Sequence, residues 1–179
     1  TKLTFGHGAT VIVGPNGSGK SNIADAMRWV LGEISSKSLR GTKMEDIIFG
    51  GADSRKPMGY AEVSVTFDNT GASGKIDCPY DEITVTRRYY RNGDSEYFIN
   101  RKEVRLRDVY EMFLNTGVGR DGYSIIGQGR IADIVSRKSD ERRGIFEDAA
   151  GIAKYRHKKN EAERRLATTR DNMERAQDI

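Results

Sequence analysis

The residues whose types and spacing could do chemistry lie near the start of the chain, in an eight-residue segment that matches G-x-x-x-x-G-K-[ST] in full. The glycines let successive backbone N–H groups turn towards one phosphate, and a helix beginning near Lys20 adds the positive end of its dipole. In such a loop the lysine reaches the β- and γ-phosphates, and the following serine ligates Mg²⁺. The segment therefore predicts a site for ATP and Mg²⁺, built from Gly14, Pro15, Asn16, Gly17, Ser18, Gly19, Lys20 and Ser21.

A phosphate-binding loop holds a nucleotide but does not hydrolyse it, because hydrolysis also needs a metal-associated carboxylate and a base that follow an apolar strand. Neither acidic pair, at 81–82 or 147–148, ends a run of four apolar residues. Residues 49–52, Phe-Gly-Gly-Ala, are faintly similar to a cassette signature, but they follow a helical turn instead of opening a helix, which favours a plain turn. We expect this chain to bind ATP but not to hydrolyse it alone.

The elements that must position the loop are predicted from its flanks. Residues 10–13 form a short β-branched run, which predicts a buried strand leading into the loop. After the loop, apolar residues recur at helical spacing, and Gly32 is a suitable stop. Strand, loop and helix are the context that the motif requires, although a glycine-rich turn can match by chance. Residues 35–59 predict a long loop with one helical turn.

From residue 60 the hydrophobic period changes to two, which predicts an antiparallel sheet. Strands are expected at 60–68, 82–90 and 96–100, with the last two joined by a hairpin turn at Asn92 and Gly93. A second hairpin is expected to turn near residues 101–102.

Helices are expected in the second half of the chain. Apolar spacing predicts one helix over residues 106–114, and Ser139 is a good N-cap for another. Past Gly151 the apolar residues are separated alternately by three and four positions, which predicts the root of an antiparallel coiled coil. An amphipathic surface helix is the alternative. The seam consists of Ile152, Tyr155, Lys159, Ala162, Leu166, Thr169, Met173 and Ala176.

Composition excludes several other classes of protein. No apolar run approaches the roughly 20 residues of a membrane helix, so a soluble intracellular protein is expected. Cys78 has no second cysteine to pair with, and His7 and His157 are too far apart in the sequence for a metal-ligand motif. The net charge of +4 is compatible with a polyanionic partner.

Several segments around the loop resemble the amino-terminal head segment of structural-maintenance-of-chromosomes (SMC) proteins, and bacterial chromosome partition proteins look most similar. The resemblance implies an α/β fold of the P-loop NTPase, ATP-binding-cassette type, with an antiparallel β subdomain and the start of a coiled coil. It divides the chain into a lobe over residues 1–150 and a neck over 151–179. The matching segments are KSNIADAMRWVLG, SLRG, KMEDIIF, YSIIGQG and RRGIFEDAAGIAKY.

The resemblance implies catalytic roles beside Lys20 for two further residues. Gln128 would lie in the Q-loop of a cassette ATPase, with its amide near Mg²⁺ and the attacking water; from spacing alone it is a flexible residue between glycines. Arg40 resembles the family's arginine finger, whose guanidinium neutralises charge on the transferring γ-phosphoryl group. The alternative is an ordinary exposed arginine.

The resemblance also implies protein partners. In the family, this segment and a carboxy-terminal lobe of the same protein form one head, and two heads of a homodimer sandwich two ATP molecules. The amino-terminal part of a kleisin subunit binds the neck, here residues 155–179, where DNA contact is the alternative. The intact ATPase would organise, condense and segregate chromosomes in the cytoplasm at the nucleoid, with no membrane partner.

Basic residues crowd the predicted junction between hairpin and helix, and one more follows Arg40. Such side chains neutralise phosphates of double-stranded DNA without reading its sequence. A solvated surface is the alternative, as is a DNA surface created only by head engagement. The residues are Lys43, Arg101, Lys102, Arg105 and Arg107. For the whole protein, the alternatives are the head of a related coiled-coil DNA-repair ATPase and a nucleotide-gated DNA-binding scaffold that needs no hydrolysis.

Overall fold

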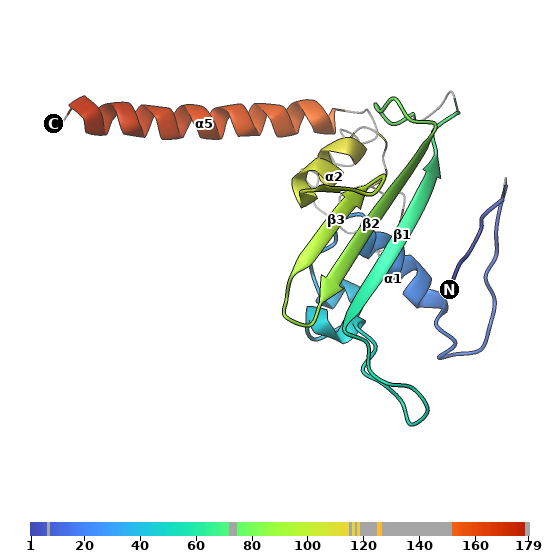
Figure 1. Ribbon diagram of the computed structural model, residues 1–179. Helices are drawn as coiled ribbons and strands as arrows, with labels where there is room; N and C mark the ends of the chain where they lie inside the picture. The colour runs from blue at the N-terminus through green and yellow to red at the C-terminus, as the bar shows by residue number, and fades with distance from the viewer. Residues whose placement is uncertain are drawn as a thin grey trace, which may run out of the picture.

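The computed structural model describes residues 1–6, 8–71, 75–114, 116, 118, 125–126 and 152–177. They form an antiparallel sheet with two helices on one face and a long third helix that projects from the body (Figure 1). The helix expected after Ser139 lies outside the described residues. Within the described part of the chain, no helix is long and apolar enough to cross a membrane.

The sheet confirms the period-two pattern. Its strands are β1 (Tyr60–Asp68), β2 (Glu82–Tyr90), β3 (Ser95–Ile99) and β4 (Lys102–Val104), paired antiparallel in the order β1-β2-β3-β4. On β2, every second residue is buried, so one face of the sheet packs inward and the other meets solvent.

Both predicted hairpin turns are present, and each requires positive φ. At the first turn, Gly93 has φ 93° and its N–H donates to the carbonyl of Tyr90 at 3.1 Å. At the second, Asn100 and Arg101 have φ 48° and 69°, the pattern of a two-residue type I′ turn. The second turn therefore begins one residue earlier than expected.

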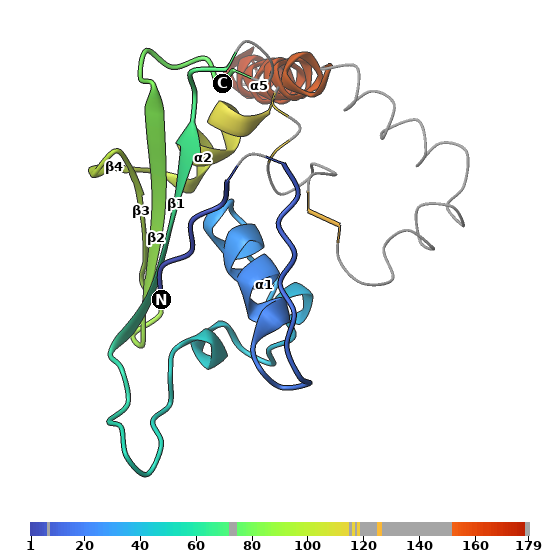
Figure 2. The same cartoon turned by 90° about the vertical axis from the view of Figure 1, so that its right-hand side faces the viewer.

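Helices α1 (Lys20–Val30) and α2 (Leu106–Phe113) cover the same face of the sheet (Figure 2). Both confirm the predicted helices, and Gly32, with φ 105°, follows the end of α1 as expected. Together the three elements enclose the main core. Its most buried members are Val30, Leu31, Ile83, Val85, Val109 and Phe113.

A second, smaller core anchors the long loop between α1 and β1. The loop contains two 3-10 turns, η1 (Lys37–Leu39) and η2 (Met44–Ile47), where one helical turn was expected. Leu39 and Ile48 are buried against Trp29 of α1 and Tyr89 of β2. Leu39 secures η1 and Ile48 secures η2, so the loop has two short helical turns instead of one.

Arg87 on β2 is a buried cation, only 3% exposed. Its Nη1 donates to the carbonyls of Trp29 at 2.9 Å and Glu33 at 2.7 Å, at the carboxyl end of α1. Its guanidinium lies 4.7 Å from the centre of the Trp29 ring and 5.0 Å from that of Tyr97. Burial lowers the pKa of Arg87, although an arginine remains charged. Arg87 thus joins the sheet to the last turn of α1.

The prediction of a buried strand at residues 10–13 is wrong for the described structure. No strand forms there, and Val11 and Val13 are 79% and 84% exposed. An extended segment becomes a strand only when a neighbour supplies hydrogen-bond partners. The four described strands pair only with one another, so this segment has no strand as a neighbour.

The long helix α5 (Ala153–Gln177) includes most of the predicted neck. Apolar side chains of the seam, Tyr155, Leu166 and Met173, are exposed on it. Glu161 and Arg165, four residues apart on this helix, form an ion pair, with Nη2 of Arg165 2.7 Å from Oε1 of Glu161. A single helix with an uncovered seam is compatible with both readings of this segment, so the coiled coil stays a prediction.

Candidate nucleotide site

The phosphate-binding loop has the backbone form that its glycines predict. Gly17 and Gly19 have φ of 82° and 87°, a region that side chains with a Cβ rarely adopt. Gly19 is the residue immediately before α1, which begins at Lys20. The loop therefore ends at a helix N-terminus, where free N–H groups and the helix dipole favour an anion.

The loop is closely packed at its first residue, Gly14. A Cβ placed on Gly14 would lie 2.8 Å from Oγ of Ser18, closer than van der Waals contact allows. The N–H of Ser18 donates to the carbonyl of Pro15 at 3.3 Å, which closes a turn within the loop. A side chain at position 14 would therefore require the Ser18 hydroxyl to move away.

The side chain of Lys20 folds back onto the start of the loop. Its Nζ donates to the carbonyls of Gly14 at 2.6 Å and Pro15 at 2.7 Å, so the ammonium sits against the start of the loop. These bonds are exposed to solvent, and an ammonium has three N–H donors to share. A nucleotide phosphate could therefore recruit Lys20 without breaking a buried interaction.

The residues fit Mg²⁺ in the manner of a nucleotide-bound metal. Ser21 is exposed in the first turn of α1 and offers one hydroxyl oxygen. The described residues contain no group of three His, Cys, Asp or Glu side chains that could hold a metal alone. Mg²⁺ commonly takes one or two protein oxygens and completes its shell with water and phosphate oxygens, as this donor set requires.

Arg40 is brought to the side of α1. Its Nε donates to Oδ2 of Asp25 at 2.9 Å, and its Nη2 contacts the same oxygen and Oδ1 of Asn22, the latter at 3.2 Å. Asn22 directly follows Ser21, so the guanidinium lies beside the first two turns of the helix that starts at the loop. Gln128, the other candidate of this kind, lies outside the described residues.

The basic candidates separate into two places. Arg101 lies in the turn between β3 and β4, and its neighbour Asn100 bonds to Thr84 near the start of β2. Lys43 precedes η2, whose anchor Ile48 packs near the other end of β2, on Tyr89. Five residues of strand, roughly 17 Å, separate Thr84 from Tyr89. Lys43 therefore does not join the cluster at the turn.

Within that cluster, one residue is already paired. Arg107 bonds to Glu111 on its own helix at 2.7 Å and to Glu161 of α5 at 3.0 Å, which links α2 to the long helix. Partial desolvation is the largest single influence on the Glu161 carboxyl, and it raises the pKa. The charges and hydrogen bonds of Arg107 and Arg165 together outweigh it, so the pKa of Glu161 is lowered. Among the described residues, Arg101, Lys102 and Arg105 are exposed and have no acidic side-chain partner.

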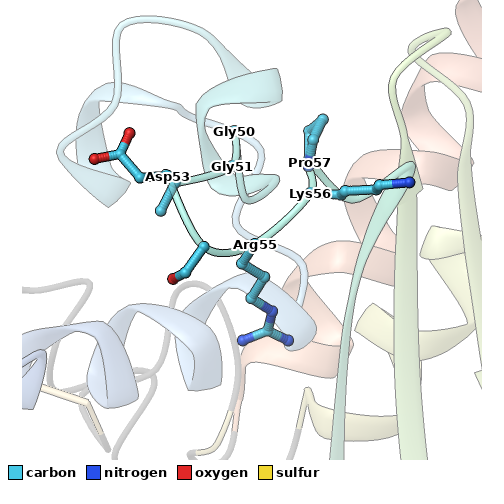
Figure 3. Close-up of a pocket in the computed structure, with 8 residues that line it drawn as sticks. Gly50, Gly51, Asp53, Arg55, Lys56 and Pro57 are labelled. Carbon is cyan, nitrogen blue, oxygen red and sulfur yellow. The ribbon is translucent and has the colours of Figure 1, made fainter.

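Residues 50–57, outside the phosphate-binding loop, line an open hollow. Ala52 and Arg55 exchange backbone hydrogen bonds, and Gly51 has φ 100°, so the segment is a tight turn as its sequence suggested. Figure 3 shows Asp53, Arg55 and Lys56 pointing away from one another. Since no polar groups converge there, this hollow is not a candidate site.

Loop, helix and sheet together define an α/β lobe with a phosphate-binding-loop motif. The chain belongs to the RecF/RecN/SMC N-terminal domain family, whose pattern matches residues 1–141. It is 56% identical over 178 residues to chromosome partition protein Smc of Desulfitobacterium hafniense (strain Y51), covering 99% of this chain and 15% of that protein. It is 53% identical over 177 residues to the protein of that name from Bacillus subtilis (strain 168), with the same coverage.

Solved structures agree with this assignment. One comes from work on the ATP-driven dimerization and DNA-stimulated activation of SMC ATPases. It is 37% identical to this chain with a TM-score of 0.71, and the match covers 82% of this chain and 87% of that one. An Smc head domain bound to the C-terminal domain of ScpA, from Pyrococcus furiosus, is 36% identical with a TM-score of 0.71 and covers 90% and 40%. This chain thus spans about 15% of the length of the curated relatives it matches.

Two features of the site had no signal in the sequence. Asp25 and Asn22 hold Arg40 from 15 and 18 positions away in the chain. In the sequence, Asp25 is one polar residue among others on an amphipathic helix. Only a search for acidic residues able to pair with Arg40 could have identified it.

Proposed function

We propose that this chain is the ATP-binding half of a chromosome-organising ATPase head, with a lobe over residues 1–150 and a neck over 151–179. The observation that carries the proposal is the loop at residues 14–21, with Lys20 against its first carbonyls and α1 starting at its end. Lys20 binds the β- and γ-phosphates and Ser21 ligates Mg²⁺. Gln128 joins Ser21 at the metal, and Arg40 acts on the γ-phosphoryl group.

Hydrolysis requires more than this chain. The hydrolytic carboxylate comes from a carboxy-terminal lobe of the same protein, and a second head completes each site in a homodimer. This division agrees with the exposed, unpaired segment at residues 10–13, which needs a strand partner from elsewhere. The ATP-driven dimerization of SMC ATPases, for which a solved relative is described, supports a site completed by a second head.

Reconstitution tests this function. We expect this chain alone to bind MgATP without turnover, and its mixture with the carboxy-terminal lobe to hydrolyse ATP at a rate that DNA increases. Release of phosphate, with and without duplex DNA, is the measurement. Turnover by this chain alone, or none by the mixture of folded lobes, would show that the division of the site is wrong.

The neck offers a surface for a kleisin subunit. Tyr155, Leu166 and Met173 are 70%, 70% and 59% exposed on α5, so these apolar side chains of the predicted seam are available to a partner. A solved Smc head relative is bound to the C-terminal domain of ScpA, a kleisin, which supports a kleisin partner for the head, while the neck contact rests on the exposed seam. The proposed kleisin contact uses residues 155–179, in a protein of the cytoplasm that associates with the nucleoid.

The turn between β3 and β4 and the start of α2 form the proposed DNA surface. Arg101, Lys102 and Arg105 project from one short stretch and have no acidic partner among the described residues, so their charge is available to phosphates. Arg107 contributes less, because Glu111 and Glu161 already neutralise it. Lys43 lies towards the other end of the sheet and is at most a separate contact.

Charge reversal at the turn should weaken DNA binding. We expect Arg101→Glu with Arg105→Glu in the intact protein to lower affinity for mixed-sequence duplex DNA and to reduce the log–log salt slope by about 2, since each lost phosphate contact removes about 0.9. Fluorescence anisotropy from 50 to 200 mM salt measures both. Arg55→Glu with Lys56→Glu, an equal change in the turn at residues 50–57, is the control. Equal losses in both double variants would remove the proposed surface.

A further inference from the structure

The guanidinium of Arg40 is held by one edge. Its Nε and Nη2 both contact Oδ2 of Asp25, and Nη2 also bonds to Asn22. Nη1 has no partner among the described residues, and the Arg40 side chain is 54% exposed. An arginine has five N–H donors in a fixed fork, so the free edge can bind a second anion while the first stays paired.

The carboxylate of Asp25, which holds this edge of Arg40, is itself well fixed. The Asp25 side chain is 13% exposed, and its Oδ1 pairs with Arg28, three residues later on α1. Both carboxylate oxygens are therefore occupied by arginines, and the helix backbone sets their direction. Asp25 follows Ser21 by four residues, roughly 6 Å of helix rise, which places the pair one turn from the proposed metal ligand.

The backbone conformation at position 40 does not favour an arginine. Its φ of 60° and ψ of 19° are left-handed, a conformation that favours glycine or asparagine. The turn is closed by backbone bonds from Arg40 N–H to Lys37 and from Gly41 N–H to Ser36, and the neighbouring Leu39 is buried. The side chain of Arg40 is thus presented on a tight, anchored turn at a conformational cost.

We propose that Asp25 is a positioning residue, which with Asn22 orients Arg40 so that its free Nη1 edge faces the phosphates of ATP bound at residues 14–21. This inference rests on the proposed ATPase function. It differs from an ordinary ion pair, because exposed pairs contribute little to stability, whereas here a mostly buried carboxylate sets the direction of a cation.

A double-mutant cycle in the intact protein tests the proposal. We expect Arg40→Ala to reduce kcat strongly, and Asp25→Asn to reduce it about tenfold or more with KM for MgATP within about twofold, because misplacing a catalytic group costs rate rather than binding. In the Arg40→Ala background, Asp25→Asn should have no further effect. Asp53→Asn, the same change at an exposed acid in the turn at residues 50–57, is the control and should leave kcat within about twofold.

Each outcome decides something distinct. Additive losses from Asp25→Asn and Arg40→Ala, an unchanged Asp25→Asn enzyme, or an equal loss in Asp53→Asn would overturn the positioning role while leaving the ATPase function intact. A wild-type protein with no turnover would instead refute the proposed function. If melting shows that Asp25→Asn does not fold, Asn22→Ala serves in the same cycle, with a smaller loss of kcat that also vanishes without Arg40.

Discussion

Replacing Lys20 with alanine should abolish measurable binding of MgATP to the intact protein, raising Kd by roughly 100-fold or more. Each charge-assisted hydrogen bond is worth about 1.5 to 3 kcal/mol, and Lys20 is expected to make such bonds to two phosphates. In the protein, the ammonium is held against the carbonyls of Gly14 and Pro15 by bonds exposed to water. Their loss costs little stability, so the variant should stay folded.

Calorimetric titration with MgATP measures this effect, and a melting curve checks the fold. Lys2→Ala is a matched control, because Lys2 is an exposed lysine of the same amino-terminal segment that lies outside the loop. We expect the control to bind as the wild type does. An unchanged affinity in Lys20→Ala would refute the assignment of residues 14–21 as the nucleotide site.

Replacing Arg87 with alanine should lower the free energy of unfolding by about 3 to 5 kcal/mol, because two hydrogen bonds from a buried charged group, each worth about 1.5 to 3 kcal/mol, are lost. The carbonyls of Trp29 and Glu33 would lose their donors at the end of α1, and a cavity would open between the Trp29 and Tyr97 rings. Because α1 carries the phosphate-binding loop at its other end, reduced nucleotide affinity should accompany this loss.

Arg88 provides the control for Arg87. It is the next residue on the same strand, so it points to the opposite, solvent-facing side of the sheet, where it pairs with Glu62 and lies over Tyr60. Arg88→Ala should cost much less. Urea unfolding followed by fluorescence of Trp29, the single tryptophan of this chain, compares the two variants. Equal losses would mean that burial of Arg87 does not stabilise the attachment of α1.

What the sequence determined by itself was local. The loop at residues 14–21 could be predicted because its glycines specify backbone angles within eight residues, and the structure has positive φ at Gly17 and Gly19. The bounds of β2 and nearly those of α1 and α2 followed from hydrophobic period, since one face of each packs on the same core.

Only the tertiary structure decided which distant residues meet. Residues 10–13 have the composition of a strand, yet they are unpaired in the described structure, because a strand depends on a neighbour as well as on its own residues. The pairing of Arg40 with Asp25 and of Arg87 with the end of α1 joins residues 15 and 54 to 58 positions apart. No periodicity records such contacts, because they arise from how the loop and the sheet pack on one helix.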